Sequence, residues 1–311
     1  ERSDTTHSPR RVERRQTLER AWRMRHFYLL LVPAIVLLIV FKYVPMYGAG
    51  IALVDYNIVK GILGSAWNNF KWFDWVFNDH FFWRVLRNTL VLSLLRLVIG
   101  FPAPIILALL LNEVRSNPYK RAVQSISYLP HFISWVVLGG IIKELLSPQR
   151  GMVPYVMSAI GLDPINFLTN PSTFRALLVA TGIWQGVGWG SIIYLAALSG
   201  IDSELYESAT VDGASRLQMA LRVTLPSLIP VMTILLLLQL GNILEQGFDQ
   251  IFNLYNDVVM SVSDVFETLV FRSGIEGAKY SYATAINLFQ NAIGFIILLV
   301  ANQFVRRHNE Y

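Results

Sequence analysis

The chain has 311 residues, of which 54% are hydrophobic and only 15% are charged. Soluble domains typically contain about 45–50% and about 25% of these residues, so the composition excludes an ordinary soluble domain and predicts a multi-pass membrane protein. The formal net charge is +5, but eight of the 26 Lys and Arg residues lie in the first 26 positions, and most of the others flank apolar segments. This distribution is typical of membrane topology and not of a nucleic-acid-binding surface.

Six apolar segments have the length of about 20 helical residues that the core of a bilayer requires. We expect an all-α membrane protein with one transmembrane domain (27–305), a basic N-terminal tail (1–26) and a short C-terminal end (306–311). Prolines inside or at the starts of the spans predict kinked helices. The spans are predicted near 27–47, 88–111, 125–146, 174–199, 227–250 and 281–305.

The distribution of basic residues predicts which side of the membrane each loop occupies. Six spans put both termini on one side, and the arginine-rich tail indicates that this side is the cytoplasm. The loops assigned to the cytoplasm contain seven Lys or Arg in 49 residues, against seven in 90 for the opposite loops. Residues 151–160 are apolar but too short to span, so we expect a helix that lies on the outer surface.

The connection between the fourth and fifth spans, residues 200–226, has the pattern of a helix-turn-helix. Asp202 or Ser203 can cap a first helix. Gly213 permits a tight reversal that a residue with a side chain would resist. A second short helix is predicted over 214–223, and Pro226 is predicted to begin the fifth span at a position that needs no amide hydrogen.

The same connection resembles the hallmark of the binding-protein-dependent ABC importer permeases. That hallmark is Glu-Ala-Ala, three residues, Gly, nine residues and Ile-x-Leu-Pro. In this chain every spacing is intact and the two departures, Ser208 and Val223, conserve size and shape. The motif here consists of Glu207, Ser208 and Ala209, then Asp212 and Gly213, and finally Val223, Leu225 and Pro226.

The resemblance extends over roughly residues 27–305 and is similar to the polysaccharide-type branch of the family. The segments that carry it are 41–48, 100–114, 128–136, 188–197 and 281–285. The resemblance implies the type I ABC importer permease fold with a cytoplasmic coupling helix, in a bacterial cytoplasmic (inner) membrane. It also implies import of oligosaccharides or polysaccharide, including uronate-containing ones such as alginate, by alternating access. A permease for a different solute class remains the alternative; a secondary carrier or a channel does not explain the motif spacing.

The resemblance further implies which partners supply what this chain lacks. They are a second homologous permease in a heterodimer, two ATPase subunits, and an extracellular or periplasmic solute-binding protein. ATP and Mg are expected on the ATPase, because this chain has no Gly-x-x-x-x-Gly-Lys-Ser/Thr phosphate loop. We expect no cofactor and no metal site on this chain, since its five histidines have no paired spacing. We also expect no enzymatic activity, since the acids of the fifth span lack a companion nucleophile.

Polar residues within the predicted spans are candidates for a substrate pathway, because they are costly in a bilayer and usually face a pathway or another helix. Asn242, Glu245 and Asp249 are spaced to share one face of the fifth span, either as a sugar contact or as a contact with the partner permease. Arg96 either attracts an anionic substrate or pairs with an acid such as Glu245 or Asp249. Further candidates are Trp184, Gln185, Trp189, Asn287, Gln290 and Asn291.

Overall fold

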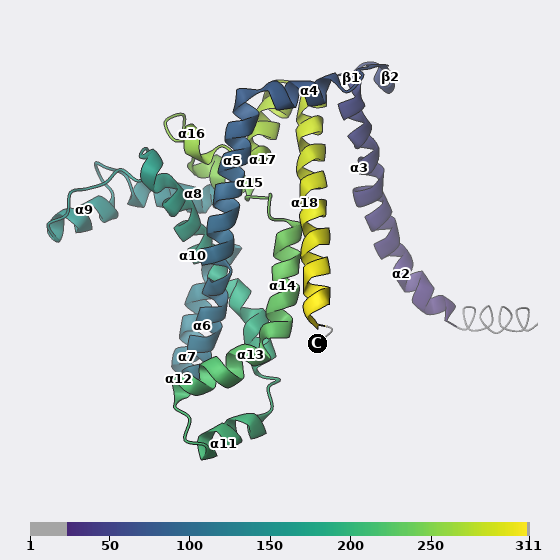
Figure 1. Ribbon diagram of the computed structural model, residues 1–311. Helices are drawn as coiled ribbons and strands as arrows, with labels where there is room; N and C mark the ends of the chain where they lie inside the picture. Colours follow the sequence, from purple (N-terminus) through teal and green to yellow (C-terminus); the bar gives the residue numbers. More distant parts are fainter. Residues whose placement is uncertain (1–23, 310–311) are drawn as a thin grey trace, which may run out of the picture. The chain divides into compact units, whose positions relative to one another are not determined.

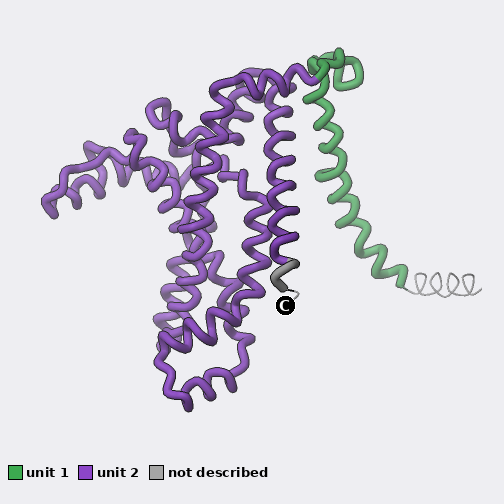
Figure 2. Tube along the Cα trace, in the orientation of Figure 1, with its two compact units in different colours: residues 1–69 green, residues 70–311 purple. Residues whose placement is uncertain are grey.

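The computed structural model describes residues 24–309, and it divides the chain into two compact units with a boundary between Asn69 and Phe70 (Figure 2). Nearly all of the basic tail expected at 1–26 lies outside the described residues. The division into a tail, a transmembrane domain (27–305) and a C-terminal end (306–311) stays a prediction.

The first unit consists of one long apolar helix and a β-hairpin. The helix covers Arg25–Leu53 and includes the segments α2 (Arg25–Leu38), η1 (Ile39–Tyr43), α3 (Val44–Met46) and η2 (Tyr47–Leu53). It contains the span predicted at 27–47. The hairpin pairs β1 (Val54–Asn57) with β2 (Gly61–Trp67) in antiparallel register.

The second unit contains three further helices that are long and apolar enough to cross a membrane. The first covers His80–Glu113 through α5 (His80–Leu95), η3 (Arg96–Gly100) and α6 (Pro102–Glu113). The others are α10 (Pro171–Leu198) and α18 (Tyr280–Asn309). They contain the predicted spans 88–111 and 281–305 and all but the last residue of 174–199.

The two remaining spans are bent pairs of helices. The helix that begins with α7 (Asn117–Tyr128) and ends with η4 (Leu129–Phe132) meets α8 (Trp135–Leu145) at 106°. The helix formed by α12 (Arg216–Met219), η5 (Ala220–Thr224) and α13 (Leu225–Ser227) meets α14 (Ile229–Gly241) at 58°. Counting each pair as one span gives up to six in the described residues, which agrees with the predicted fold class.

The prediction of one continuous helix over 227–250 is wrong. α14 ends at Gly241, and the chain turns through residues 242–247 before α15 (Phe248–Leu254) begins after Gly247, whose φ is +74°. A glycine adopts this left-handed conformation at little cost, which allows a break at the point where the apolar sequence gives way to polar residues.

Short helices connect the spans of the second unit. α4 (Lys71–Asn78) precedes α5, and α9 (Met152–Ala159) follows α8, so the short helix expected at 151–160 is present. α11 (Ser203–Val211) precedes α12. Between α15 and α18 lie α16 (Met260–Ser263), α17 (Phe266–Val270) and η6 (Phe271–Glu276). Figure 1 shows α4 and α11 at opposite ends of this unit.

Three π-turns precede prolines, and the prolines explain them. The backbone amide of the residue before each proline donates a hydrogen bond to the carbonyl oxygen five residues earlier. These bonds run from Val44 to Ile39, from Phe101 to Arg96 and from Leu225 to Ala220. A proline has no amide hydrogen, and its ring collides with the carbonyl four residues earlier in a regular α-helix. A widened turn moves that carbonyl aside, so these helices continue through their prolines.

The core of the second unit forms around α10. Phe174 and Leu178 of α10 are fully buried against Leu92 of α5, Leu138 of α8 and Ile251 of α15. Gly188 permits a close approach of α10 to α7, because a Cβ there would lie 2.1 Å from the carbonyl oxygen of Ser127. Small residues at such crossings are typical of helix packing in membranes.

Candidate functional site

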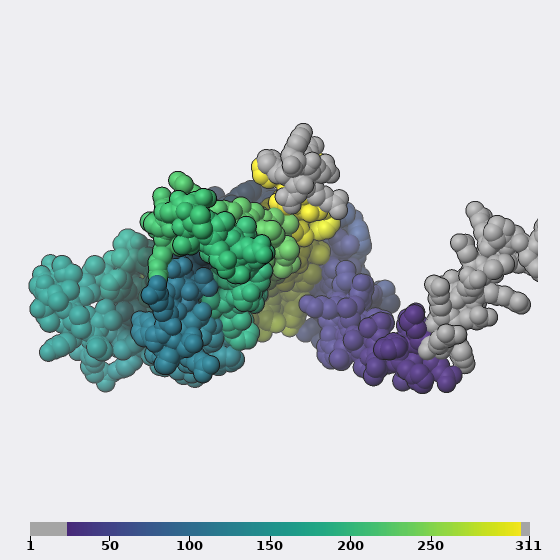
Figure 3. All heavy atoms as spheres, turned by 90° about the horizontal axis from the view of Figure 1, so that it is seen from below, coloured from purple at the N-terminus to yellow at the C-terminus, as the bar shows by residue number. Residues whose placement is uncertain are grey.

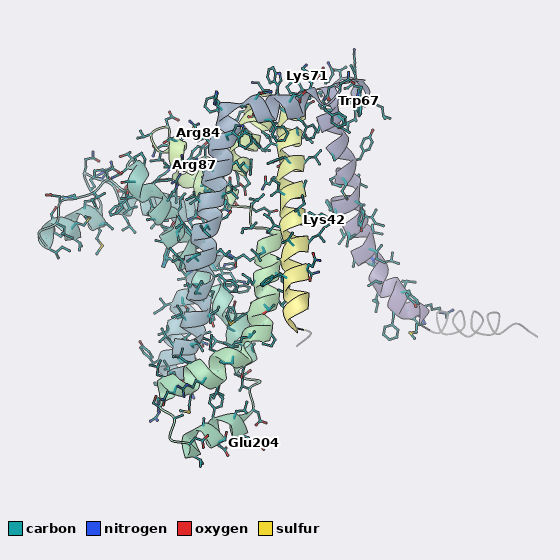
Figure 4. All side chains as sticks on the ribbon, in the orientation of Figure 1. Lys42, Trp67, Lys71, Arg84, Arg87 and Glu204 are labelled. Carbon is teal, nitrogen blue, oxygen red and sulfur yellow. The ribbon has the colours of Figure 1, made fainter. Side chains whose placement is uncertain are left out.

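The first candidate site is the loop that contains α11 and α12, at one end of the second unit (Figure 1). α11 begins at Ser203 because Asp202 caps it: the Oδ1 atom of Asp202 accepts a hydrogen bond from the amide of Glu204 at 3.0 Å. Glu204, which Figure 4 labels, lies in the first turn, where a negative charge complements the helix dipole. The predicted start of the helix is thus confirmed.

α11 ends in a Schellman motif that depends on Gly213. The amide of Ala214 donates to the carbonyl of Ala209 at 2.9 Å, and the amide of Gly213 donates to Thr210 at 3.0 Å. Gly213 has a φ of +76°, and no heavy atom lies within 4 Å of the position that its Cβ would take. The requirement for glycine is therefore conformational and not steric, as the sequence indicated.

The helix after Gly213 begins later than predicted and continues past its predicted end at residue 223, so Pro226 does not begin a new helix. Ser215 caps α12 in a reciprocal capping box with Gln218, and the helix continues through η5 to Ser227. Pro226 lies inside this helix after the π-turn. Pro230, in the first turn of α14, is the proline that begins the apolar part of the fifth span.

Three side-chain contacts hold this loop as one rigid piece on the bundle. The hydroxyl of Tyr206 lies 3.0 Å from Oγ1 of Thr224, which is buried, and the hydroxyl of Thr210 lies 3.8 Å from the sulfur of Met219. Arg216 lies 3.8 Å from Glu113 at the end of α6. α11 is thereby tied to the helix that leads into α14.

The loop also exposes apolar side chains. Val211 and Leu217 are 88% and 69% exposed, and Leu205 and Glu207 are exposed beside them. Figure 3, which views the molecule from below, shows this segment in green on the face toward the reader. Apolar groups presented by a rigid, well-capped loop are typical of a surface that another protein covers.

The second candidate site is a cavity of about 490 Å³ among the spans. It contains Arg96 and Gln185, two of the predicted pathway residues, together with two further glutamines, Gln239 and Gln250. Aromatic side chains lie beside these polar groups. The lining comes from η3, α6, α8, α10, α14 and α15 and includes Phe101, Trp135 and Tyr194.

Arg96 is held by neutral acceptors in this cavity. Its Nη1 atom donates to the carbonyl oxygen of Gln246, and its Nη2 atom donates to Oε1 of Gln250 at 2.6 Å. The side-chain Nε2 atom of Gln250 donates to the carbonyl oxygen of Leu178 at 2.7 Å and to Oγ1 of Thr181 at 2.8 Å. Among the described residues no carboxylate lies within 4.0 Å of Arg96, so it forms no ion pair with Glu245 or Asp249.

The other predicted pathway residues lie outside the lining of this cavity. Because of the break after Gly241, Asn242, Glu245 and Asp249 do not share a helical face: Asn242 caps α14, Glu245 lies in the turn and Asp249 lies in α15. The remaining five are dispersed. Trp184, Asn287 and Asn291 are exposed, Trp189 stacks on His131 at 4.7 Å, and Gln290 donates to the carbonyl of Leu244 at 3.1 Å.

Residues that sequence reasoning missed complete the environment of Arg96. Glu267 of α17 accepts a hydrogen bond from the amide of Gln246, and its other oxygen, Oε2, is buried without a hydrogen-bond partner. Gln250 was overlooked because it stands at the edge of the predicted span. The sequence feature that could have identified Glu267 as a buried acid is its position as the single acid within the largely apolar segment 265–270. No group of His, Cys, Asp or Glu suited to a metal ion occurs among residues 24–309.

A bundle of apolar helices with a polar cavity between its spans and a rigid capped loop at one end defines a subunit of a membrane transport system. Residues 100–307 match the family described as binding-protein-dependent transport system inner membrane component. The chain belongs to this family. It is therefore an inner-membrane transport component and the permease subunit of an ABC importer, as the sequence predicted.

Individual relatives agree over nearly the whole chain. The polygalacturonan/rhamnogalacturonan transport system permease protein YteP of Bacillus subtilis (strain 168) is 40% identical over 301 residues, which cover 97% of this chain and 94% of that protein. Protein LplB of the same organism is 40% identical over 288 residues, which cover 93% of this chain and 91% of that protein.

A crystal structure of a bacterial ABC transporter involved in the import of the acidic polysaccharide alginate contains a similar chain. It matches with a TM-score of 0.86 and 42% identity, over 94% of this chain and 99% of that one. A second structure, of the bacterial alginate ABC transporter in complex with an alginate pentasaccharide-bound periplasmic protein, matches with the same score and identity over 93% and 96%. The similarity supports the fold described above.

Proposed function

We propose that this chain is the permease subunit of an ATP-driven importer for acidic oligosaccharides, with Arg96 as the cation that attracts the sugar carboxylates. The observation that carries the proposal is the cavity around Arg96. Its guanidinium is bonded to a carbonyl and a carboxamide, both neutral, so its charge is not cancelled by a direct ion pair. A cation is expensive to place among spans and is usually functional there.

The lining of the cavity suits a sugar. Gln185, Gln239 and Gln250 offer amide donors and acceptors for hydroxyl groups, and Trp135 and Phe101 offer apolar faces for the ring. The relatives named above include permeases for a galacturonan and for alginate, and both substrates are acidic polysaccharides. We propose that Asn242, Glu245, Asp249, Asn287 and Asn291 contact either substrate or the partner permease in another state of the cycle.

We further propose that the α11–α12 loop docks on an ATPase subunit that carries ATP and Mg. Three contacts support transmission of a rigid-body motion from this loop into α14. They are the Asp202 cap of α11, the Schellman motif at Gly213 and the contact between Tyr206 and Thr224. The motif residues Glu207, Ser208, Ala209 and Asp212 lie on the segment that would enter the ATPase. In this proposal both termini and the α11–α12 loop lie in the cytoplasm.

The complete importer then contains a second homologous permease, two ATPase subunits and a solute-binding protein on the outer side. Closure of the ATPases would move the coupling loops and switch the paired permeases from inward-facing to outward-facing. Alternating access of this kind needs a difference between the two states in their affinity for the substrate.

The test is ATPase activity and uptake by the complex reconstituted in proteoliposomes with its solute-binding protein. Galacturonate and alginate oligosaccharides are compared with neutral oligosaccharides of equal length. Uptake of the acidic sugars, coupled to ATP hydrolysis, is expected. Stimulation only by neutral sugars, peptides or amino acids would overturn the substrate assignment and leave the permease role standing.

A further inference from the structure

A second cavity of the second unit is lined by residues of α4, α5, η6 and α18. Figure 1 shows α4 at the end of this unit that is opposite α11. The volume of the cavity is about 510 Å³, within the range of about 300–1,000 Å³ that is typical of small-molecule sites. It shares no lining residue with the cavity around Arg96. The lining includes Trp75, Asn78, Asp79, Phe81, Arg84, Arg272 and Lys279.

Positive charge predominates in this lining, which has three cations and one carboxylate. Asp79, the carboxylate, is fully engaged with neutral donors: its Oδ1 atom accepts from the amide of Phe81 at 2.8 Å, and its Oδ2 atom accepts from the hydroxyl of Tyr282 at 2.6 Å. Asp79 thus caps α5 and fixes α18, and neither oxygen is bonded to a cation.

Arg272 is the one cation of the three that has a carboxylate partner. Its Nη2 and Nη1 atoms donate to the two oxygens of the fully buried Asp264, at 2.6 and 3.2 Å. Burial acts to lower the pKa of Arg272, but the hydrogen bonds and the charge of Asp264 outweigh it and raise that pKa. This pair is structural and leaves Arg84 and Lys279 as the available cations.

Arg84 and Lys279 have no acidic partner within 4.0 Å among residues 24–309. Arg84 (labelled in Figure 4) lies over the ring of Phe81, with its Cζ atom 4.9 Å from the ring centroid, and its Nε atom is buried without a hydrogen-bond partner. The backbone fixes Lys279: Ala278 has a φ of +51°, and the amide of Lys279 donates to the carbonyl of Ser273 at 2.9 Å. A non-glycine residue in this conformation is strained, which is typical of functional positions.

Exposed aromatic rings stand beside these two cations. Trp75 and Phe81 are each 55% exposed although both line the cavity, and Trp75 is held by an edge-on contact with Trp72 at 5.4 Å. Rigid aromatic faces offer apolar contact area at low entropic cost. The cavity thus offers two cations without an acidic partner and two aromatic faces. A sugar acid requires these groups: donors for its carboxylate and flat surfaces for its ring.

We propose that this cavity is an entry site that binds one uronate residue of the oligosaccharide before it reaches the spans, with its carboxylate between Arg84 and Lys279 and its ring against Trp75 or Phe81. The inference rests on the proposed function for acidic substrates and adds a second, separate site. The orientation proposed above places this cavity on the outer side, where a solute-binding protein delivers substrate.

The test is isothermal titration of the purified membrane complex, without solute-binding protein, with trigalacturonate and with its carboxyl-reduced neutral analogue. Titrations are made in the Arg96→Gln background, so that the central cavity no longer contributes its cation. The acidic trimer is expected to bind, and the neutral one about tenfold more weakly or not at all. Lys279→Gln and Arg84→Gln are each expected to weaken binding of the acidic trimer by about tenfold.

The matched control is Lys143→Gln, an exposed lysine that lines a different cavity and should leave the titration unchanged. Lys279 is also exposed, so the fold should tolerate its replacement even if Arg84→Gln fails to assemble. Equal binding of the acidic and neutral trimers, or unaltered binding by Lys279→Gln, would overturn the entry site. Uptake of acidic oligosaccharides by the wild-type importer is measured separately. Uptake without the expected titration results would exclude the entry site alone, whereas absence of uptake would exclude the proposed function.

Discussion

Arg96 and Glu267 both hydrogen bond to the backbone of one residue, Gln246. Arg96 donates to the carbonyl oxygen of Gln246, and the amide of Gln246 donates to Glu267. The cation comes from the π-turn η3, the acid comes from α17, and Gln246 lies in the turn that interrupts the fifth span. The break in that span is therefore held by a hydrogen bond from Arg96 on one side and a hydrogen bond to Glu267 on the other, with no direct ion pair.

This arrangement predicts which charge substitutions are coupled. Arg96→Gln and Glu267→Gln should each lower the thermal stability of the purified protein, and the double variant should lose less than the sum of the two. Residues in one hydrogen-bond network typically show coupling of about 0.5–3 kcal/mol. The measurement is a double-mutant cycle in detergent.

The structure also predicts the outcome of a charge swap between Arg96 and Glu245. The double variant Arg96→Glu with Glu245→Arg should not regain the transport that Arg96→Glu alone loses, since Glu245 is exposed and forms no ion pair with Arg96. Transport regained by the double variant would contradict the structure.

A second prediction concerns the left-handed glycine of the coupling loop. Gly213→Pro should abolish ATP-driven transport while membrane insertion is retained, because proline cannot adopt a φ of +76° and removes the amide that bonds to Thr210. Uptake and the level of inserted protein are measured together. Gly161→Pro is the control: Gly161 has a φ of +79° and equally open surroundings but lies after α9, so its variant should still transport.

The local chemistry of this loop was predictable from sequence. An acidic cap at Asp202 and a glycine C-cap at Gly213 act through hydrogen bonds to residues no more than five positions away, so the pattern alone identifies them. The later start of α12 was not predicted, because the capping box of Ser215 with Gln218 competes with the helical potential of Ala214. Pro226 was misplaced because the π-turn before it allows the helix to continue.

The environment of Arg96 was beyond sequence reasoning. Its partners Gln246 and Gln250 are 150 and 154 residues away, and no periodicity in the second span identifies them. The spacing of Asn242, Glu245 and Asp249 fits a helix, and only the left-handed Gly247 and the network around Gln246 explain why the helix stops. Six spans could be counted from apolar length and kinks were expected from the prolines, whereas the angles of 106° and 58° could not be predicted from the sequence.

A third prediction concerns the contact between α11 and the helix that leads into the fifth span. Tyr206→Phe removes the hydroxyl that lies 3.0 Å from Thr224 and should cost about 1 kcal/mol of local stability. A looser loop should transmit less motion, so stimulation of ATP hydrolysis by the loaded binding protein should fall while basal hydrolysis is retained. Tyr119→Phe, at an exposed tyrosine of α7, should change neither rate. Equal stimulation in the two variants would exclude a coupling role for the contact.

A fourth prediction compares the two described ion pairs. Asp264→Asn removes the charge of the fully buried Asp264 from its pair with Arg272, whose side chain is 30% exposed, and should destabilise the protein by about 1.5–3 kcal/mol, because two hydrogen bonds between charged groups are weakened. Glu113→Gln removes an exposed pair with Arg216 at 3.8 Å and should cost about 1 kcal/mol or less. Thermal unfolding in detergent measures both. Similar losses for the two variants would contradict the assigned burial.

The most direct test of the central claim is uptake of a uronate oligosaccharide and of its carboxyl-reduced analogue by the reconstituted importer, for the wild type and for Arg96→Gln. If Arg96 attracts the sugar carboxylates, the wild type should transport the acidic sugar in preference, and Arg96→Gln should lower its uptake by about tenfold without lowering that of the neutral analogue. An equal loss for both sugars, or no loss for the acidic one, would contradict the account.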